Sequence, residues 1–134
     1  MTGLAGDFYY SKLDSTLSTL ALSLGVMDDQ EFRTRADAAL EDLSRRLAAA
    51  GEVHEFESDF NSGALSIEFD EPPAKFVVSP NAPVRQIWIS AHSRSFKLVW
   101  DAARVAFVLP ASGETLVEFV SGAISTHLGE AVAL

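Results

Sequence analysis

The chain has 134 residues, with 10 Lys and Arg against 19 Asp and Glu, 48% hydrophobic residues and no cysteine. This length suits one domain with one core, and the apolar fraction argues against disorder along the whole chain. Without cysteine, the chain has no disulfide, thiolate metal site or Cys nucleophile. The net charge of −9 disfavours nucleic acid and membrane as partners, because both attract basic surfaces, and favours cations or basic proteins.

The negative charge is confined to the first half of the chain. Residues 1–71 contain 15 acids and 5 bases, whereas residues 72–134 contain 4 acids and 5 bases. The net charge is therefore −10 in the first half and +1 in the second. A surface that attracts a cation or a basic protein is accordingly expected in the first half.

Residues 1–26 are interpreted as a leader of unknown role, followed by one domain over residues 27–134. Leucines at helical spacing in the leader predict either a short amphipathic helix or a frayed end, and Met27 is an alternative start. The leader lacks the basic start of a signal peptide and the Arg-rich, acid-free composition of a transit peptide. No stretch of the chain reaches the roughly 18 consecutive apolar residues of a membrane-spanning helix.

Two helices are predicted from the spacing of apolar residues. Residues 28–50 carry apolar side chains at steps of three and four, and Asp28 or Asp29 can cap the start of this helix. Gly51 can end it. The last helix is predicted to begin at the capping residue Ser112 and to end at Gly129.

Between the helices the period changes to two, which predicts strands. The first strand turns its acids to one face, and Asn61-Ser62-Gly63 is a turn signal. Short connections imply an antiparallel meander. The predicted fold class is therefore α+β: a two-layer α–β sandwich whose antiparallel sheet of about six strands packs the N- and C-terminal helices on one face. The predicted strands cover residues 53–60, 65–69, 76–79, 86–90, 96–100 and 105–109.

No residue is predicted to be catalytic. The chain contains no nucleophile elbow, P-loop, dinucleotide-binding motif or HExxH motif. The histidines His54, His92 and His127 lie on different predicted elements without metal-site spacing, so we interpret each as a surface or partly buried side chain. The carboxylates of the first strand have no predicted pocket that would separate their pKa values for acid–base work.

Acidic side chains of the first helix and the first strand are the candidate cation site. If that strand lies at the sheet edge beside the helix, they form one carboxylate ridge, and hard cations such as iron, manganese or calcium prefer oxygen ligands. The alternative is an ordinary solvated face, because several acids stand four residues before an arginine. The pairs interpreted in this way are Glu31–Arg35, Glu41–Arg45 and Asp42–Arg46.

Trp88 is predicted to lie on the solvent face of the sheet. Ile87 and Ile89 flank it and supply the opposite, core face. An indole on an exposed strand face is typical of an interaction site, since Trp is enriched in interface hot spots.

In order and spacing, these features resemble the frataxin family, more closely its bacterial CyaY branch. Pro83-Val84-Arg85-Gln86-Ile87-Trp88-Ile89-Ser90 is similar to the family's Pro-x-x-Gln-Ile-Trp-Leu-Ser. The hairpin over residues 61–67, the helix opening over residues 28–32, Trp100 and the helix start over residues 112–116 also fall in register. The resemblance extends from Met27 to Leu128, about four-fifths of the chain.

The resemblance implies a role in iron–sulfur cluster assembly, as iron donor or as regulator of the cysteine desulfurase and its scaffold protein. It implies weakly bound Fe²⁺ or Fe³⁺, a bacterial cytoplasmic location (mitochondrial in a eukaryote) and a monomer, with iron-dependent oligomers as an alternative. The outer-sheet partner surface would comprise Asn81, Gln86 and Trp88. The implied metal-binding ridge comprises Asp28, Asp29, Glu31, Asp37, Glu41, Asp42, Glu55, Glu57 and Asp59. A metal-independent protein-interaction module and a weak ferroxidase remain as alternatives.

Overall fold

The computed structural model describes residues 27–134. The predicted leader, residues 1–26, lies outside them. Helix α2 (Asp29–Ala50) precedes the strands in the sequence, and helix α3 (Leu116–Leu128) follows them. None of the described helices is long and apolar enough to cross a membrane. The elements between α2 and α3 are β1 (Glu57–Asn61), β2 (Ala64–Asp70), β3 (Pro73–Asn81), the short 3-10 helix η1 (Ala82–Val84), β4 (Gln86–Ala91), β5 (Arg94–Asp101) and β6 (Ala106–Val108).

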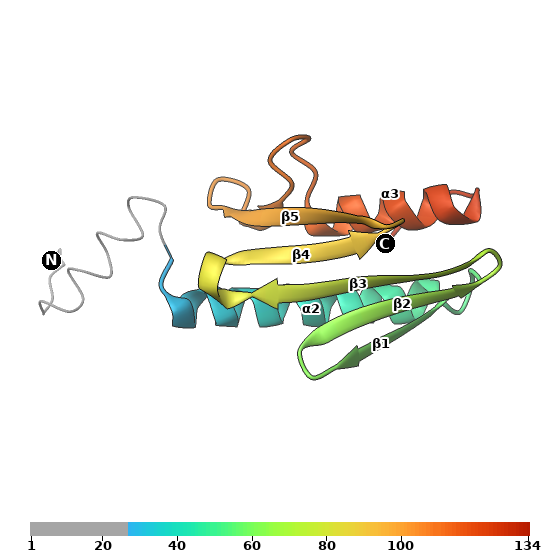
Figure 1. The fold of residues 1–134 in the computed structure, drawn as a ribbon, viewed down its shortest axis with the longest axis horizontal. Coiled ribbons are helices and arrows are strands. Elements are labelled where there is room, and N and C mark those ends of the chain that lie inside the picture. Colours follow the sequence, from blue (N-terminus) through green and yellow to red (C-terminus); the bar gives the residue numbers. More distant parts are fainter. Residues whose placement is uncertain (1–26) are drawn as a thin grey trace, which may run out of the picture.

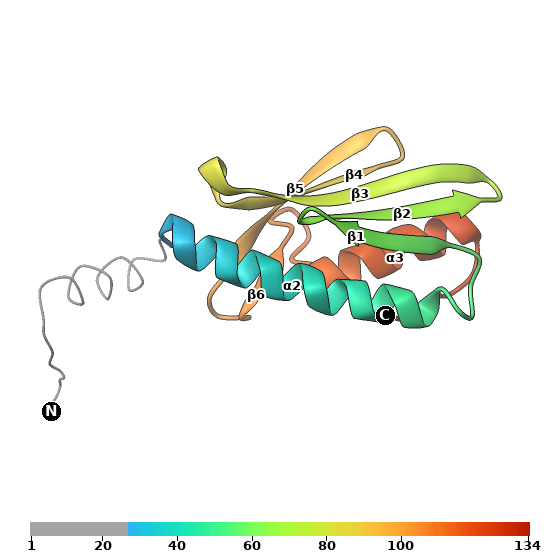
Figure 2. The same ribbon diagram turned by 90° about the horizontal axis from the view of Figure 1, so that it is seen from below.

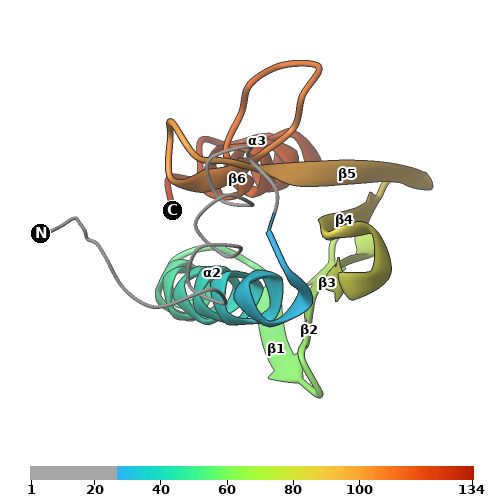
Figure 3. The same ribbon diagram turned by 90° about the vertical axis from the view of Figure 1, so that its left-hand side faces the viewer.

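The strands form one antiparallel sheet in the order β1-β2-β3-β4-β5-β6. Both helices lie on the same face of this sheet (Figures 1 and 2). Viewed end-on, the sheet curves around them, with α2 beside β1, β2 and β3 and α3 beside β5 and β6 (Figure 3). The structure thus confirms the predicted α+β sandwich with six strands and both helices on one face.

The core lies between the helices and the inner face of the sheet. Apolar stripes at helical spacing are buried on α2 and α3, and Ile87 and Ile89 are buried on β4. The ring of Phe107 on β6 packs edge-on against Phe32 on α2, with centroids 5.8 Å apart. Each fully buried side chain of this size contributes about 1.5–3 kcal/mol to stability. The helical core residues are Phe32, Ala36, Leu40, Leu43 and Leu47 on α2, and Leu116, Val120 and Ile124 on α3.

A two-residue turn fixes the register of the β1–β2 hairpin. Ser62 and Gly63 both have positive φ, 55° and 80°, as the type I′ turn of a tight hairpin requires. Glycine reaches this conformation at no steric cost. Asn61 consequently pairs with Ala64, and Glu57 lies directly opposite Glu68.

The ends of α2 lie where the sequence predicts them. The Asp28 carboxylate caps the first turn by accepting a hydrogen bond of 2.7 Å from the backbone N–H of Glu31. Gly51 ends the helix with φ −66°, so the left-handed conformation is not what it provides. A Cβ at Gly51 would lie 3.0 Å from the carbonyl oxygen of Phe56. Glycine is therefore suited to this position by the close approach of the next segment.

The predicted first strand begins four residues too early. The N–H groups of Val53 and His54 both donate to the carbonyl of Ala50, which prolongs the end of α2 into a turn. Pairing with β2 starts only at Glu57. Glu55 therefore lies in the α2–β1 connection and not on the strand.

Other predicted boundaries are also wrong, among them those of β3 and the start of α3. Strand β3 extends from Pro73 to Asn81. Pro80, which has no N–H to donate, is tolerated in this strand because pairing with β2 already ends at Val78 and Pro80 pairs only with β4. Helix α3 is capped by Thr115, not by Ser112: Thr115 and Glu118 form a reciprocal capping box.

The segment after Gly129 folds back onto the helices, which no sequence pattern predicted. Val132 is buried, its N–H donates to the Ser125 hydroxyl at 2.9 Å, and its carbonyl accepts from the Ser121 hydroxyl. Arg46 on α2 donates to the Leu134 carbonyl at 3.0 Å. This segment therefore joins α3 to the end of α2.

Candidate functional site

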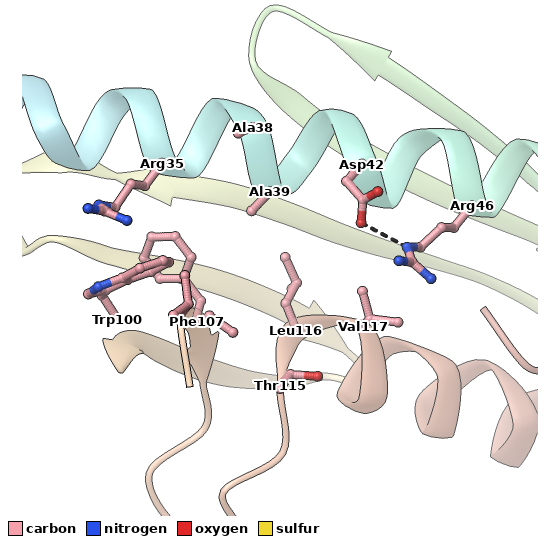
Figure 4. A pocket seen from close by; sticks show the side chains of 12 residues that line it. Arg35, Ala38, Ala39, Asp42, Arg46, Trp100, Phe107, Thr115, Leu116 and Val117 are labelled. Carbon is pink, nitrogen blue, oxygen red and sulfur yellow. Dashed lines mark hydrogen bonds and ion pairs between the residues drawn. The ribbon is translucent and has the colours of Figure 1, made fainter. Parts of the chain in front are cut away.

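Helix α2 carries its acids on two sides that differ in their surroundings. We call the side toward α3 the α3 flank and the side toward the β1–β2 hairpin the β1 flank. The α3 flank lines a groove between the helices (Figure 4). On the β1 flank, Asp37 lies in a hollow with Ser62 and Gly63, and Glu41 follows one turn later. The α3 flank includes Arg35, Ala39, Asp42 and Arg46; the β1 flank includes Arg33, Asp37 and Glu41.

Arginines neutralise the acids of the α3 flank. Arg35 forms an ion pair of 2.8 Å with Glu31, and its guanidinium lies 4.4 Å from the centre of the Trp100 ring. Asp42 binds Arg46 at 2.8 Å (Figure 4). The predicted pairs Glu31–Arg35 and Asp42–Arg46 are confirmed, so these two carboxylates are poorly placed to receive a cation.

The predicted pair between Glu41 and Arg45 is absent. Arg45 turns instead toward Asp42, three residues away, at 3.3 Å, so that Asp42 pairs with both Arg45 and Arg46. Within residues 27–134, Asp37 and Glu41 form no ion pair. Among the described residues, no base therefore neutralises the negative charges of Asp37 and Glu41 on the β1 flank.

At the start of α2, two predicted ridge acids are already engaged. The Asp28 carboxylate serves as the helix cap. Asp29 binds Arg33 at 2.7 Å and lies 3.9 Å from Arg85 on the turn before β4. Both carboxylates are already bonded at the start of α2, so they are less available to a cation.

Strand β1 and the connection before it bring further carboxylates to the same edge of the sheet. Glu55, Glu57 and Asp59 are exposed and form no ion pair within residues 27–134. Glu55 and Glu57 line one hollow together with Glu68 and Asp70 of β2. Lys75 forms one long ion pair with this group, at 3.8 Å from Glu68.

Glu68 and Asp70 are acids that the sequence analysis missed. The signal that could have found them is the two-residue turn, because a turn at Ser62-Gly63 dictates that position 57 pairs with position 68. Like charges directly opposite each other destabilise a strand pair. The Glu57–Glu68 pair is therefore a local cost in stability of the kind found at functional surfaces.

Five predicted ridge acids that form no ion pair within residues 27–134 are called the acidic edge below: Asp37, Glu41, Glu55, Glu57 and Asp59. They lie on α2, on β1 and in the connection between them, and β1 runs beside α2 (Figure 2). Within residues 27–134, no three His, Asp or Glu side chains converge closely enough to hold a metal ion. The acidic edge is thus an extended negative surface and not a preformed cage.

The predicted partner surface is brought together on the outer face of the sheet. Asn81 on β3 pairs with Gln86 on β4, and Gln86 accepts a hydrogen bond of 2.8 Å from the Trp88 indole. Trp88 keeps 37% of its surface exposed, and the Lys97 ammonium lies 5.1 Å from its ring centre. The indole is therefore held in a fixed orientation while one face stays available to solvent.

His92 and His127 are far apart in the sequence but lie together in the structure. The turn between β4 and β5 places His92 beside the last turn of α3, and the two rings approach to 3.2 Å. His54 instead binds Glu130 at 2.6 Å. All three side chains are exposed or partly buried, as predicted, but the sequence did not predict that His92 and His127 meet.

Comparison with known proteins identifies the family. A family model described as a frataxin-like domain matches residues 25–130. The chain belongs to the frataxin-like family. This confirms the resemblance seen in the sequence.

Among the family's curated members, the iron-sulfur cluster assembly protein CyaY of Thioalkalivibrio sulfidiphilus is 27% identical over 108 residues, covering 81% of this chain and all of that protein. The CyaY protein of Azotobacter vinelandii, with the same description, is 28% identical over 93 residues, which cover 68% of this chain and 84% of the relative. The solved structure of the frataxin from Psychromonas ingrahamii has the same fold, with a TM-score of 0.69 at 23% identity, covering 80% of this chain and 97% of that one.

Proposed function

We propose that this frataxin-like protein binds iron weakly and acts in iron–sulfur cluster assembly, as iron donor or as regulator of a cysteine desulfurase and its scaffold protein. The bacterial relatives are described as iron-sulfur cluster assembly proteins, which supports this role and a cytoplasmic location. The observation that carries the proposal is the acidic edge, whose five carboxylates form no ion pair within residues 27–134.

The acidic edge suits iron that is bound weakly and released easily. Fe²⁺ and Fe³⁺ accept carboxylate oxygens as ligands. Tight binding requires several ligands at fixed positions, and the described residues provide no such group of three. Iron would therefore keep most of its water ligands and exchange quickly, which suits a donor better than a store.

The same charge can guide the protein to a basic patch on the desulfurase. Complementary charges raise association rates by about 10- to 1,000-fold, and salt screens the effect. We expect binding to a bacterial desulfurase to weaken steeply with added salt, and to weaken further in Glu41→Lys with Glu55→Lys. The control is Glu114→Lys, which reverses a charge on the connection before α3. Equal binding by both variants at every salt concentration would contradict docking through the acidic edge.

Trp88 is the proposed contact with the scaffold protein. A Trp that is oriented by Gln86 and partly exposed has the properties of an interface anchor, and removing such an anchor typically costs about 2 kcal/mol or more. Trp88→Ala should therefore weaken scaffold binding by more than about tenfold. The control is Val105→Ala, since Val105 is exposed at the other side of the molecule, in the groove between the helices. A scaffold affinity unaffected by Trp88→Ala would refute the assignment.

A metal-independent interaction module is the second candidate function. It is favoured by the lack of a three-residue metal group within residues 27–134. Under this alternative the acidic edge binds only the basic protein, and desulfurase binding is the same with and without iron. An iron titration of the free protein separates the two functions.

A further inference from the structure

His92 and His127 form a pair of imidazole rings at the end of the sheet where β2 turns into β3 and β4 turns into β5. His92 lies in the turn that joins β4 to β5, and His127 in the last turn of α3. The Nε2 atom of His92 and the Nδ1 atom of His127 are 3.2 Å apart. The other nitrogen of His127, Nε2, lies 2.7 Å from the carbonyl oxygen of Pro72, between β2 and β3.

The bond to Pro72 determines which nitrogen of His127 carries a lone pair. A carbonyl oxygen only accepts hydrogen bonds, so Nε2 of His127 is the protonated nitrogen that donates to it. In the neutral ring Nδ1 is then unprotonated, and its lone pair is directed to the side where His92 lies. A backbone carbonyl is one of the usual acceptors for the second nitrogen of a metal-binding histidine.

Aromatic packing holds both rings in place. His127 lies against Phe69, with ring centroids 4.4 Å apart, and His92 packs edge-on against Phe76 at 5.0 Å. Both phenylalanines are buried in the core. The pair is therefore attached to rigid structure, although His92 itself is exposed and open to ions from solvent.

We propose that His92 and His127 form a binding site for a borderline divalent cation of the Zn²⁺ class. Two nitrogen ligands of a tetrahedral Zn²⁺ lie about 3.3–3.4 Å apart, since each Zn–N bond is about 2.0–2.1 Å. The observed 3.2 Å between the two nitrogens is close to this value. On binding, the proton of His92 moves from Nε2 to Nδ1, so that both facing nitrogens offer a lone pair. The His92 ring stays neutral, and the protein releases no proton.

The site differs in chemistry from the acidic edge, and it does not depend on the proposed function. Imidazole nitrogens suit Zn²⁺, whereas the carboxylates of the acidic edge suit hard cations. The location near the C-terminal end of α3 favours a cation, because the helix dipole is negative there. No third His, Asp or Glu within residues 27–134 completes the site. Water fills the remaining positions, so binding is weak and exchangeable.

A bound ion would link three elements that are separate in the chain. His92 belongs to the β4–β5 turn, His127 to α3, and the Pro72 carbonyl to the connection between β2 and β3. Because the ion binds the folded protein, in which these groups meet, it stabilises the fold by mass action. Zn²⁺ should therefore raise the melting temperature of the full chain, in addition to changing the histidine spectra.

The test is a titration of the full 134-residue chain, without a histidine tag, with zinc chloride. Calorimetry gives the affinity, and ¹⁵N NMR of the imidazole rings identifies the ligands. We expect one Zn²⁺ per chain, with shifts at Nε2 of His92 and Nδ1 of His127. His92→Asn should lower the affinity by about tenfold or more and abolish the zinc-dependent rise in melting temperature. Asparagine is chosen because His92 has a φ of 52°, which Asn tolerates.

The matched control is His54→Asn, which removes a histidine that binds Glu130 and not another ring. This variant should bind Zn²⁺ like the unchanged protein. His127→Gln should lose binding as His92→Asn does, and melting curves without zinc show whether each variant is folded. The proposal is overturned if His92→Asn binds Zn²⁺ as tightly as the unchanged chain, or if zinc shifts only signals of the acidic edge.

Discussion

The two flanks of α2 have similar sequences but different electrostatic roles. Each carries acids and arginines at helical spacing. On the α3 flank, Arg35 is stacked on Trp100 and Arg46 donates to the Leu134 carbonyl, so the arginines are fixed beside Glu31 and Asp42. On the β1 flank, Asp37 and Glu41 face a hairpin that carries more acid. Tertiary surroundings, more than i,i+4 spacing, thus decide which carboxylates keep their charge available.

The largest expected effect comes from removing the buried stripe that separates the flanks. Leu40→Ala should lower the free energy of unfolding by about 2–5 kcal/mol, because it leaves a cavity beneath both flanks. Urea denaturation measures this, with the exposed Thr34→Ala on the same helix as control. A loss below about 1 kcal/mol would show that the stripe is not the common support of the two flanks.

A smaller effect is expected from the arginine that anchors the α3 flank. Arg35→Ala should cost about 1–2 kcal/mol, because it removes both the contact with Trp100 and the ion pair with Glu31. Arg33→Ala on the β1 flank is the matched control: its pair with Asp29 is equally short but its side chain is 65% exposed. The comparison fails if the two variants lose the same free energy of unfolding.

Neutralising one acid on each flank should separate them further. Asp42→Asn is expected to cost up to about 1 kcal/mol, because it releases Arg45 and Arg46. Asp37→Asn should leave the free energy of unfolding within about 0.5 kcal/mol, since no ion pair within residues 27–134 is lost. Urea unfolding at low and high salt measures both. A larger loss for Asp37→Asn than for Asp42→Asn would reverse the assignment of the flanks.

The smallest expected effect is a gain in stability at the acidic edge. Glu57→Gln should stabilise the protein by a few tenths of a kcal/mol (about 0.2–0.5), because it removes the repulsion from Glu68 directly opposite. Asp59→Asn is the control, since its cross-strand partner is the uncharged Ser66. Thermal unfolding of both variants measures the difference. Destabilisation by Glu57→Gln would mean that the carboxylate makes a favourable contact.

The sequence predicted most of the fold because its period is unambiguous in the main elements. Three patterns predict their elements correctly: the apolar stripe predicts α2, the alternation around Trp88 predicts β4, and the turn at Ser62-Gly63 predicts the β1–β2 hairpin. The errors lie at boundaries. Thr115 rather than Ser112 caps α3 because the capping box is completed by Glu118, and β1 starts late because Val53 and His54 bond to the end of α2.

The candidate site was harder to predict, because ion pairing and proximity depend on tertiary contacts. Spacing alone predicts that Arg45 pairs with Glu41. In the structure Arg45 binds Asp42 instead, which the sequence pattern does not indicate. The grouping of Glu68 with Glu57 follows from strand register. The pairing of His92 with His127 depends on how α3 crosses the end of the sheet, which no local pattern reports.

The most direct test of the central claim is an anaerobic titration of the full chain with Fe²⁺, followed by amide NMR. We predict that the largest changes fall on Asp37, Glu41 and residues 55–59, while Glu31 and Asp42 on the α3 flank change little. Equal changes on both flanks, or none at millimolar iron, would contradict the claim that the carboxylates of the acidic edge form the iron-binding surface.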